Sequence, residues 1–239
     1  MKIKIIPCLQ DNYTYLIIDQ KNNIACVVDP GESKPVIEYL ENKKIQLKFI
    51  LNTHHHFDHI DGNTELKNKY NAKIIGYEKS KNQIPGIDIL LKDNEIWNFK
   101  NFETQIIHVP GHTLNHICFY FYNENIIFTG DTLFSLGCGK IFEGTHSQMF
   151  NSLNKIKKIP AETKIYCGHE YTLANSEFCI AHDINNIKLK NKIFEIKRKL
   201  SKKLPTIPTT LKEELECNIF LKSNTLDDFS KLRDLKDNF

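Results

Sequence analysis

Residues 53–62, THHHFDHIDG, hold five potential metal ligands within six positions: His54, His55, His56, Asp58 and His59. Imidazoles and a carboxylate packed together without a ligand would leave unpaired polar groups or repelling charges, so a stable core has no use for such a cluster. In an extended or turning segment, residues 54 and 56 point the same way, whereas residue 55 points elsewhere. Residues 58 and 59 then begin a helix and face a second point nearby. The stretch therefore predicts two incomplete halves of a metal site.

Three other apolar runs end in a possible ligand and could complete those halves. QIIHVPGH ends at His112, IIFTGD at Asp131 and KIYCGH at His169, and FILNTHHH has the same form. Four strands thus each deliver a ligand just beyond their carboxyl ends, which is where open α/β sheets place their sites. Histidine and carboxylate ligands suit Zn²⁺, with Fe and Mn as alternatives, and no thiolate is needed.

Working outward, the first 170 residues consist of short runs rich in Ile, Val, Phe and Tyr, separated by Gly, Pro, Asn and Asp. The pattern predicts strands at 3–7, 13–18, 24–28, 49–51, 73–76, 102–108, 116–122, 126–128 and 164–166. Helical patterns fall at 33–43, 62–70 and 147–157. Consecutive strands followed by a mixture of strands and helices predict a layered α/β fold with a mixed sheet.

The pattern changes after about residue 171. Residues 172–204 are predicted to be helical, with apolar side chains at helix spacing and Lys on the opposite face. PTIPTT at 205–210 ends this segment because proline cannot continue a helix, and a last helix is expected at 226–235. We therefore expect a catalytic domain at 1–171 and a small α-helical domain at 172–239.

Composition excludes several classes of protein. With 239 residues, 41% of them hydrophobic and 26% charged, the chain is of ordinary globular type. No run approaches the roughly 18–20 apolar residues of a membrane helix, and MKIKIIPCLQDNY lacks the apolar core of a secretory signal. Seven cysteines without a CxxC pair argue against a disulfide framework and for a reducing, cytoplasmic setting.

The formal net charge of +3 is unevenly distributed. Residues 1–180 carry 19 basic and 20 acidic side chains, whereas residues 181–239 carry 13 basic and 9 acidic ones. Nucleic acid, a membrane surface or a small acidic ligand could bind a basic tail, although a solvated Lys-rich helix gives the same composition. Only two of the 32 basic residues are Arg, namely Arg198 and Arg233.

The strings THHHFDH, PGHT, TGDT and CGHEYT, in this order, resemble the metallo-β-lactamase superfamily. GDTLFSLGCGKIFEGT, CGHEYT and the terminal LRDLKDNF are similar to glyoxalase II, the hydroxyacylglutathione hydrolases. The likeness runs from residue 1 to residue 239. It implies an αββα sandwich followed by a small C-terminal helical domain.

The resemblance also implies roles for individual residues. One metal ion would be held by His54, His56 and His112. A second would be held by Asp58, His59 and His169, with Asp131 bridging both ions, so that Asp58 and Asp131 are the catalytic carboxylates. The glutathione contacts would be Lys140, Tyr171, Arg233 and Lys236.

The activity implied is hydrolysis of S-(2-hydroxyacyl)glutathione, typically S-D-lactoylglutathione, to glutathione and a 2-hydroxy acid such as D-lactate, the second step of methylglyoxal detoxification. The partner is then a small thioester, with no nucleic acid and no membrane, and the chain is expected to be a monomer. The rival activities are a mononuclear-iron oxygenase acting on glutathione persulfide and a nuclease of the same superfamily. A binding module that kept the fold is the non-enzymatic rival, but it predicts missing ligands and none is missing.

Three positions depart from the family pattern. Asn115 and Asp61 replace residues that are commonly Gly, and Phe142 stands where some relatives have Tyr. The first two could change loop geometry or metal preference, and Phe142 removes a possible hydroxyl contact to the substrate. The remaining histidines, at positions 55, 108, 116, 146 and 182, are expected to pack or support rather than bind metal, and Cys138 and Cys167 are not expected to be nucleophiles.

Overall fold

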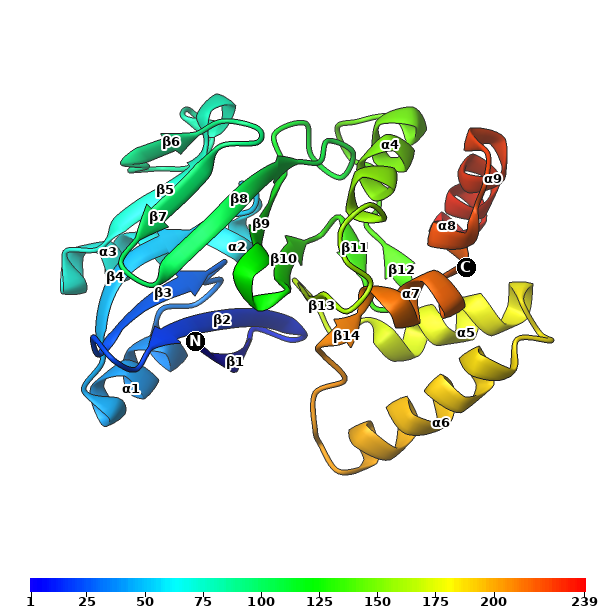
Figure 1. The fold of residues 1–239 in the computed structure, drawn as a ribbon, viewed down its shortest axis with the longest axis horizontal. Helices are drawn as coiled ribbons and strands as arrows, with labels where there is room; N and C mark the ends of the chain where they lie inside the picture. Colours follow the sequence, from blue (N-terminus) through cyan, green and yellow to red (C-terminus); the bar gives the residue numbers. More distant parts are fainter. The chain divides into compact units, whose positions relative to one another are not determined.

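The computed structural model describes residues 1–239, which form two compact units (Figure 1). The first comprises Met1–His108 and Asn115–Glu124, and the second comprises Val109–Leu114 and Asn125–Phe239. No helix in either unit has the length and apolar character required to cross a membrane.

The first unit contains a six-stranded mixed sheet in the order β1-β2-β3-β4-β5-β6. Its strands are β1 (Lys2–Cys8), β2 (Asn12–Asp19), β3 (Ile24–Val28), β4 (Gln46–Leu51), β5 (Lys73–Tyr77) and β6 (Ile89–Leu91). Strand β2 is antiparallel to both of its neighbours, β1 and β3, and β3 to β6 run parallel. Every residue of β2 and β3 is buried, as expected for strands covered on both faces.

The helices of the first unit are α1 (Lys34–Lys43), α2 (Phe57–Ile60) and α3 (Asn63–Tyr70), with short 3₁₀ turns at Glu78–Ser80 and Tyr122–Glu124. The apolar stripes of α1 and α3 join one core with the sheet, in which Leu40 and Leu66 pack with Leu47 and Ile50. This burial of an amphipathic face is the main source of helix stability in a folded chain.

A second, antiparallel set of strands in the same unit comprises β7 (Ile96–Phe99), β8 (Phe102–His108) and β9 (Ile117–Phe121). The ring of Phe49 on β4 meets Trp97 and Phe99 on β7 edge to face, each at 4.9 Å between ring centroids. The two sets of strands therefore pack together through aromatic side chains.

The second unit begins with strands and continues as helices. Its strands are β10 (Ile126–Gly130), β11 (Leu133–Phe134), β12 (Gly137–Cys138), β13 (Lys164–Cys167) and β14 (Thr209–Thr210). Strand β13 runs parallel to β10 and antiparallel to β14, and β11 and β12 form a hairpin. Its helices are α4 (His146–Ile156), α5 (Thr172–His182), α6 (Ile187–Ser201), α7 (Leu211–Cys217), α8 (Ile219–Lys222) and α9 (Leu226–Asp237).

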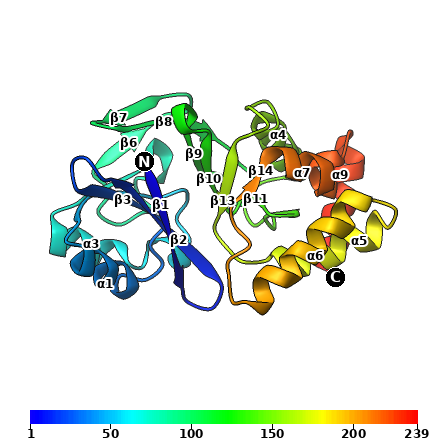
Figure 2. The same ribbon diagram turned by 60° about the horizontal axis from the view of Figure 1, so that its bottom comes forward.

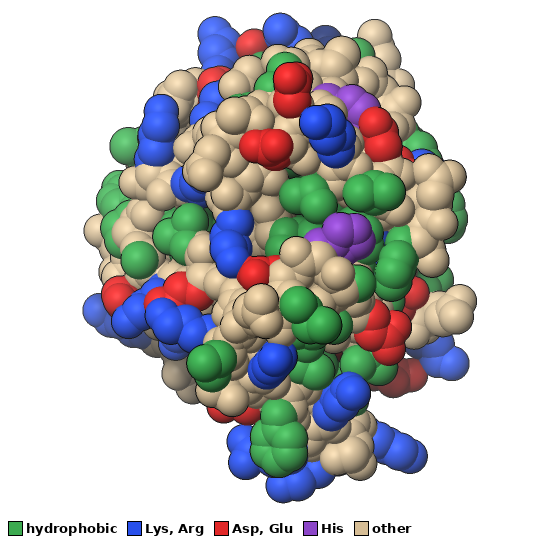
Figure 3. Space-filling view, turned by 90° about the vertical axis from the view of Figure 1, so that its right-hand side faces the viewer, with side chains coloured by type: hydrophobic (Ala, Val, Ile, Leu, Met, Phe, Trp, Pro, Cys, Tyr) green, Lys and Arg blue, Asp and Glu red, His purple; other side chains and the backbone are tan.

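Helices α5 and α6 lie side by side (Figures 1 and 2). Helix α6 buries Leu189 and Ile196, which are seven residues apart, and exposes most of its lysines. Basic side chains gather at the lower end of the face drawn in Figure 3, where Figure 1 places α6. Six of the 13 basic residues in the basic end of the chain thus lie on this helix, and four of the six are exposed.

The structure confirms the nine predicted strands and the helices predicted in both parts of the chain, with ends that differ by a few residues. Strands β6, β7, β11, β12 and β14 and helices α7 and α8 were not predicted. Four of these strands have only two or three residues and the fifth, β7, sits at a sheet edge, so they have little apolar pattern of their own. All seven cysteines are free and buried, which confirms the expected absence of disulfides.

Candidate metal centre

One group of candidate ligands lies in the first unit and starts where β4 ends. The Thr53 backbone N–H donates to Asp29 Oδ1 at 2.8 Å, and the Thr53 carbonyl accepts from the Ile117 N–H at 2.9 Å. The Thr53 hydroxyl donates to Asp29 Oδ2 at 2.6 Å. These bonds fix the direction in which the chain leaves the strand, just before the first histidine.

The rings of His54 and His56 lie close together, as expected if residues 54 and 56 point the same way. His54 Nε2 lies 3.1 Å from His56 Nδ1, and His54 Nδ1 lies 3.1 Å from the hydroxyl of Thr53. The His54 ring is 1% exposed and stacks on His116 at 4.6 Å. Because the Nδ1 atom of His54 is occupied by Thr53, its Nε2 atom is the one that faces a shared ligand position.

Asp58 and His59 belong to the short helix α2, which confirms the predicted helix start. His59 Nδ1 lies 3.1 Å from Asp29 Oδ2, and its Nε2 lies 3.6 Å from Asp58 Oδ2. Asp58 Oδ2 also accepts a hydrogen bond from the Asn12 amide at 2.9 Å. A carboxylate on one ring nitrogen of a histidine fixes the direction of the other nitrogen, so Asp29 holds His59 with its Nε2 atom turned toward Asp58.

The second unit has its own group of candidate ligands, three residues that meet at one oxygen atom. Asp131 directly follows β10, His169 follows β13, and His112 lies in the segment Val109–Leu114. Asp131 Oδ2 lies 3.5 Å from His112 Nε2 and 3.2 Å from His169 Nε2. All three side chains are buried. This single carboxylate therefore faces one histidine predicted for each metal ion.

Two glycines allow close backbone approaches beside these ligands. A Cβ atom on Gly139 would lie 1.9 Å from the Asp131 carbonyl oxygen, and one on Gly31 would lie 2.3 Å from the Asp58 carbonyl oxygen. Because Gly139 lets the chain pass Asp131, the next carbonyl, that of Lys140, accepts a hydrogen bond from His112 Nδ1 at 2.7 Å. This bond directs His112 Nε2 toward Asp131.

The donor atoms within each group of candidate ligands have a spacing that fits divalent metal ions. Two ligands at ~2.0–2.1 Å from a tetrahedral zinc ion are about 3.3 Å apart. The four pairs of facing donor atoms described above are separated by 3.1 to 3.6 Å. A carboxylate, a backbone carbonyl and a hydroxyl occupy the outer nitrogens of His59, His112 and His54, respectively, as in metal sites. The His and Asp clusters can therefore hold divalent ions.

The predicted glutathione contacts all lie in the second unit. The Tyr171 ring stacks on His169 at 4.6 Å with 5° between the planes and is 37% exposed. The Lys140 side chain is exposed. Lys236 Nζ lies 5.2 Å from the rings of Phe178 and Phe239, and burial, together with the charge of neighbouring Arg233, lowers its pKa.

Arg233 is more enclosed than a surface contact residue. Only 4% of it is exposed, its Nη1 donates to the Cys138 carbonyl at 2.8 Å, and its Nε and Nη2 contact Asp237 at 3.0 and 2.7 Å. Its guanidinium also lies 5.2 Å from the ring of Phe220. Arg233 thus binds the chain just before Gly139, in addition to any contact it makes with a substrate.

The three departures from the family pattern are accommodated locally. The Asn115 amide donates to the Lys79 carbonyl at 3.2 Å and to Gln83 at 2.8 Å. Phe142 is 63% exposed and meets the His112 ring edge to face at 5.2 Å. Asp61 is exposed at the end of α2.

The cysteines near the site are not activated. Burial raises the pKa of Cys167 to about 12 and also raises that of Cys138, against the opposing effect of Arg233. Thiols with raised pKa values stay protonated and are poor nucleophiles at neutral pH. This agrees with the prediction that neither acts in catalysis.

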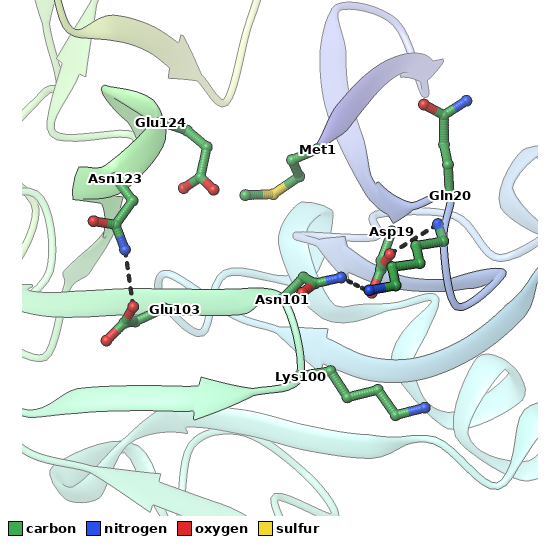
Figure 4. A pocket seen from close by; sticks show the side chains of 9 residues that line it. Met1, Asp19, Gln20, Lys100, Asn101, Glu103, Asn123 and Glu124 are labelled. Carbon is green, nitrogen blue, oxygen red and sulfur yellow. Dashed lines mark hydrogen bonds between the residues drawn. The ribbon is translucent and has the colours of Figure 1, made fainter.

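A separate pocket of about 510 Å³ in the first unit carries none of the predicted ligands (Figure 4). Its polar side chains already bind one another, since Asn101 donates to Asp19 at 2.9 Å and Asn123 donates to Glu103 at 2.8 Å. The pocket has no histidine or free thiol, and its chemistry does not resemble that of the candidate centre.

Sequence reasoning missed the residues that support the ligands. Asp29 and Asn12 are far along the chain from the histidine cluster and received no role. A signal was present for Asp29, because it directly follows the buried strand β3 and precedes Pro30 and Gly31. The Lys140 carbonyl could not have been found, because every residue carries one.

Two family models match consecutive parts of the chain. The model of the metallo-beta-lactamase superfamily matches residues 10–169, and that of the hydroxyacylglutathione hydrolase C-terminus matches residues 170–239. A hydroxyacylglutathione hydrolase of Pelagibacter ubique is 69% identical over 239 residues and the whole of both chains. One from Methylococcus capsulatus is 40% identical over 222 residues, covering 93% of this chain and 87% of that one.

Solved structures show the same fold at lower identity. The BLEG-1 B3 metallo-beta-lactamase gives a TM-score of 0.73 at 22% identity over 93% of this chain and all of the other. ETHE1 from Myxococcus xanthus gives 0.74 at 23% identity over 98% and 90%. These likenesses, with the helical region after residue 170, confirm the expected fold class. Because both family models match and a relative is 69% identical over its full length, the chain belongs to the hydroxyacylglutathione hydrolases, or glyoxalase II, of the metallo-β-lactamase superfamily.

Proposed function

We propose that the chain hydrolyses S-(2-hydroxyacyl)glutathione thioesters, typically S-D-lactoylglutathione, to glutathione and a 2-hydroxy acid such as D-lactate. The observation that carries this proposal is the full-length similarity to hydroxyacylglutathione hydrolases, which includes the C-terminal region specific to them. That reaction is the second step of methylglyoxal detoxification. We also propose that the enzyme is a cytoplasmic monomer without nucleic-acid or membrane partners.

The proposed centre holds two divalent ions, which we take to be Zn²⁺, with Fe and Mn as alternatives. His54, His56 and His112 would bind one ion. Asp58, His59 and His169 would bind the other. The position of Asp131 Oδ2 between His112 and His169 supports its role as the bridging ligand.

Bound divalent ions lower the pKa of coordinated water to about 7 and stabilise negative charge on a carbonyl oxygen. The chain's own contribution is to hold its ligands rigidly. Asp29 orients His59, Thr53 orients His54, and the Lys140 carbonyl orients His112. The leaving thiolate of glutathione has a pKa of about 8.5, judged from cysteine, so it departs without a strong protein acid.

Glutathione carries two carboxylates and one ammonium group at neutral pH, and we propose that cationic side chains of the second unit bind it. Lys236, on α9, is the more accessible of the two C-terminal cations, and Arg233 would act beside it. Lys140 and Tyr171 would contact the rest of the tripeptide. The exposure of Tyr171 and of Lys140 is consistent with this.

The test is release of free thiol from S-D-lactoylglutathione by the purified protein, with metal content measured in parallel. We expect hydrolysis and two metal ions per chain. One iron per chain, with oxygen consumption on glutathione persulfide and no thioester hydrolysis, would instead support the mononuclear oxygenase. Binding to RNA or DNA that falls steeply with salt would support the nuclease.

A further inference from the structure

The hairpin formed by β11 and β12 lies among the proposed site residues. It starts two positions after Asp131 and ends directly before Gly139 and Lys140. The ring of Phe134 on β11 contacts His169 at 6.0 Å and Tyr171 at 5.3 Å. Any shift of this hairpin would therefore move the Lys140 carbonyl, which supports His112. It would also move the Phe134 ring, which contacts His169.

All five carbonyls from Phe134 to Cys138 accept hydrogen bonds from side chains of the last 70 residues. The donors are Asn218 to Phe134 and Gly137 (3.5 and 3.1 Å), Asn175 to Ser135 (3.1 Å), Cys179 to Leu136 (3.1 Å) and Arg233 to Cys138 (2.8 Å). A tight two-stranded hairpin has few hydrogen bonds of its own and is only marginally stable alone. The helical region therefore supplies most of the bonds that define the hairpin.

Glu214 on α7 is the one acidic side chain in this set of contacts. It is fully buried, and its Oε2 accepts from the Leu136 N–H at 2.7 Å and from the Asn218 amide at 3.1 Å. Its Oε1 accepts from the Thr209 hydroxyl at 2.7 Å and from Lys192 Nζ at 3.1 Å. Leu136 has a φ of 59°, a conformation that non-glycine residues adopt only when their surroundings hold them there.

A buried carboxylate and its buried counter-ion cost desolvation energy, and replacing both with apolar groups is often neutral for stability. The Glu214–Lys192 pair therefore needs an explanation besides stability. The other carboxylate oxygen, Oε2, supplies that explanation, because it accepts the backbone N–H of Leu136 at the left-handed turn of the hairpin.

We propose that Glu214 is a positioning residue that fixes the β11–β12 hairpin, and through it His112 and His169, for metal binding. The proposal rests on the proposed function for its catalytic consequence, but its structural consequence can be measured separately. The C-terminal helices then have a second task beyond providing cations for glutathione: they shape the loop next to Asp131.

Two double variants separate the acceptor role from the ion pair. In Glu214→Leu with Lys192→Met, both charges are gone and the Leu136 N–H has lost its acceptor. In Glu214→Gln with Lys192→Met, both charges are also gone, but an amide oxygen remains to accept that N–H. The matched control is Asp88→Leu with Lys67→Met, because Asp88 also accepts from a lysine (2.7 Å) and a backbone N–H, that of Ile74 (2.8 Å).

The first readout is amide hydrogen exchange of residues 132–140 in metal-free protein. We expect faster exchange there in the leucine variant, with protection restored in the glutamine variant and unchanged in the control. The second readout is metal affinity, by competition with a chelator, together with kcat and KM. We expect about a tenfold loss of affinity and kcat in the leucine variant, with KM little changed and recovery to within about threefold in the glutamine variant.

The proposal would be overturned if the leucine variant had the amide exchange rates and the metal affinity of the wild-type protein. The proposal would also be overturned if the glutamine variant showed the same fast amide exchange and the same loss of metal affinity as the leucine variant. The charge of Glu214, and not its acceptor oxygen, would then hold the hairpin. If the leucine variant does not fold, Asn218→Ser takes its place. This variant keeps an oxygen to cap α8 but lacks the amide that donates to the Phe134 and Gly137 carbonyls, so it should give the same changes at smaller size. Wild-type exchange and metal affinity in this variant would refute the proposal. If the wild-type protein hydrolyses no glutathione thioester, the proposed function fails. Amide exchange and metal affinity of the variants would still test the positioning role of Glu214.

Discussion

Asp131 is the residue on which most of the proposed chemistry depends, because one of its oxygens faces both His112 and His169. We predict that Asp131→Ala removes both metal ions and lowers kcat by at least about 100-fold. Losing a residue that only supports a metal ligand already lowers activity by about 10- to 100-fold, and Asp131 is a proposed ligand itself. Metal analysis and thioester hydrolysis measure the two effects.

A matched control for this substitution is Asp19→Asn. Asp19 is also a buried carboxylate, and it accepts hydrogen bonds from Lys21, Asn22 and Asn101. This variant should lose stability but keep its metal. If Asp131→Ala retained two ions per chain, the bridging assignment would be wrong.

Asp29 acts one step behind the ligands, through Thr53 and His59. We predict that Asp29→Asn lowers metal affinity by about 10- to 100-fold. The Asp29 carboxylate accepts three hydrogen bonds, from the Thr53 N–H, the Thr53 hydroxyl and His59 Nδ1. An asparagine amide has only one acceptor oxygen, so at least one of these bonds is lost. Isothermal titration of metal-free protein with Zn²⁺ gives the affinity, and an unchanged value would show that His59 needs no carboxylate to orient it.

At the scale of elements, an ion pair ties the turn between α5 and α6 to α8. Lys222 donates to Asp183 and lowers its pKa below the ordinary 3.8, and Asn186 also donates to that carboxylate at 2.9 Å. A carboxyl with a lowered pKa in the folded state stabilises the protein above its unfolded pKa, and this contribution is lost as pH falls through the folded value.

We therefore predict that Asp183→Asn lowers the free energy of unfolding at pH 7 by about 1 kcal/mol or less, since the pair is partly exposed. The difference from wild type should shrink as pH falls below the ordinary pKa of 3.8 and through the lower pKa of the folded protein, because Asp183 then becomes protonated. Urea unfolding of Asp183→Asn, Lys222→Gln and the double variant, as a function of pH, measures the coupling. A coupling that grows with acidity would contradict the assignment.

Much of the fold could be predicted because strands such as β3 and β8 and the helix α6 have the apolar periods of their structures. The ligand-bearing strand ends were predictable for the same reason, because each ligand follows an apolar run. The β11–β12 hairpin could not be predicted, since its conformation is set by side chains 40 to 95 residues away rather than by its own sequence. The burial of Arg233 was missed for the same reason, because helix periodicity does not reveal a carbonyl partner in a distant loop.

At the scale of the whole molecule, the basic end of the chain divides into two kinds of cation. Lys190, Lys197 and Arg198 lie exposed on α6, whereas Lys236 is partly buried between aromatic rings. Exposed charges act on a ligand mainly at long range and are screened within about 10 Å at 0.1 M salt. A cation in contact with a carboxylate contributes roughly 1.5–3 kcal/mol, or about tenfold or more in affinity.

We predict that Lys236→Gln raises KM for S-D-lactoylglutathione about tenfold with little change in kcat. The triple change of Lys190, Lys197 and Arg198 to Gln should alter kcat/KM by less than about twofold at 0.1 M salt. Arg233→Ala should raise KM and also lower the melting temperature, since it removes a buried bond to Cys138. Assays at low and high salt separate contact from long-range attraction, because screening erases only the latter. A triple variant as impaired as Lys236→Gln would mean that the basic surface as a whole, and not the C-terminal helix, attracts the substrate.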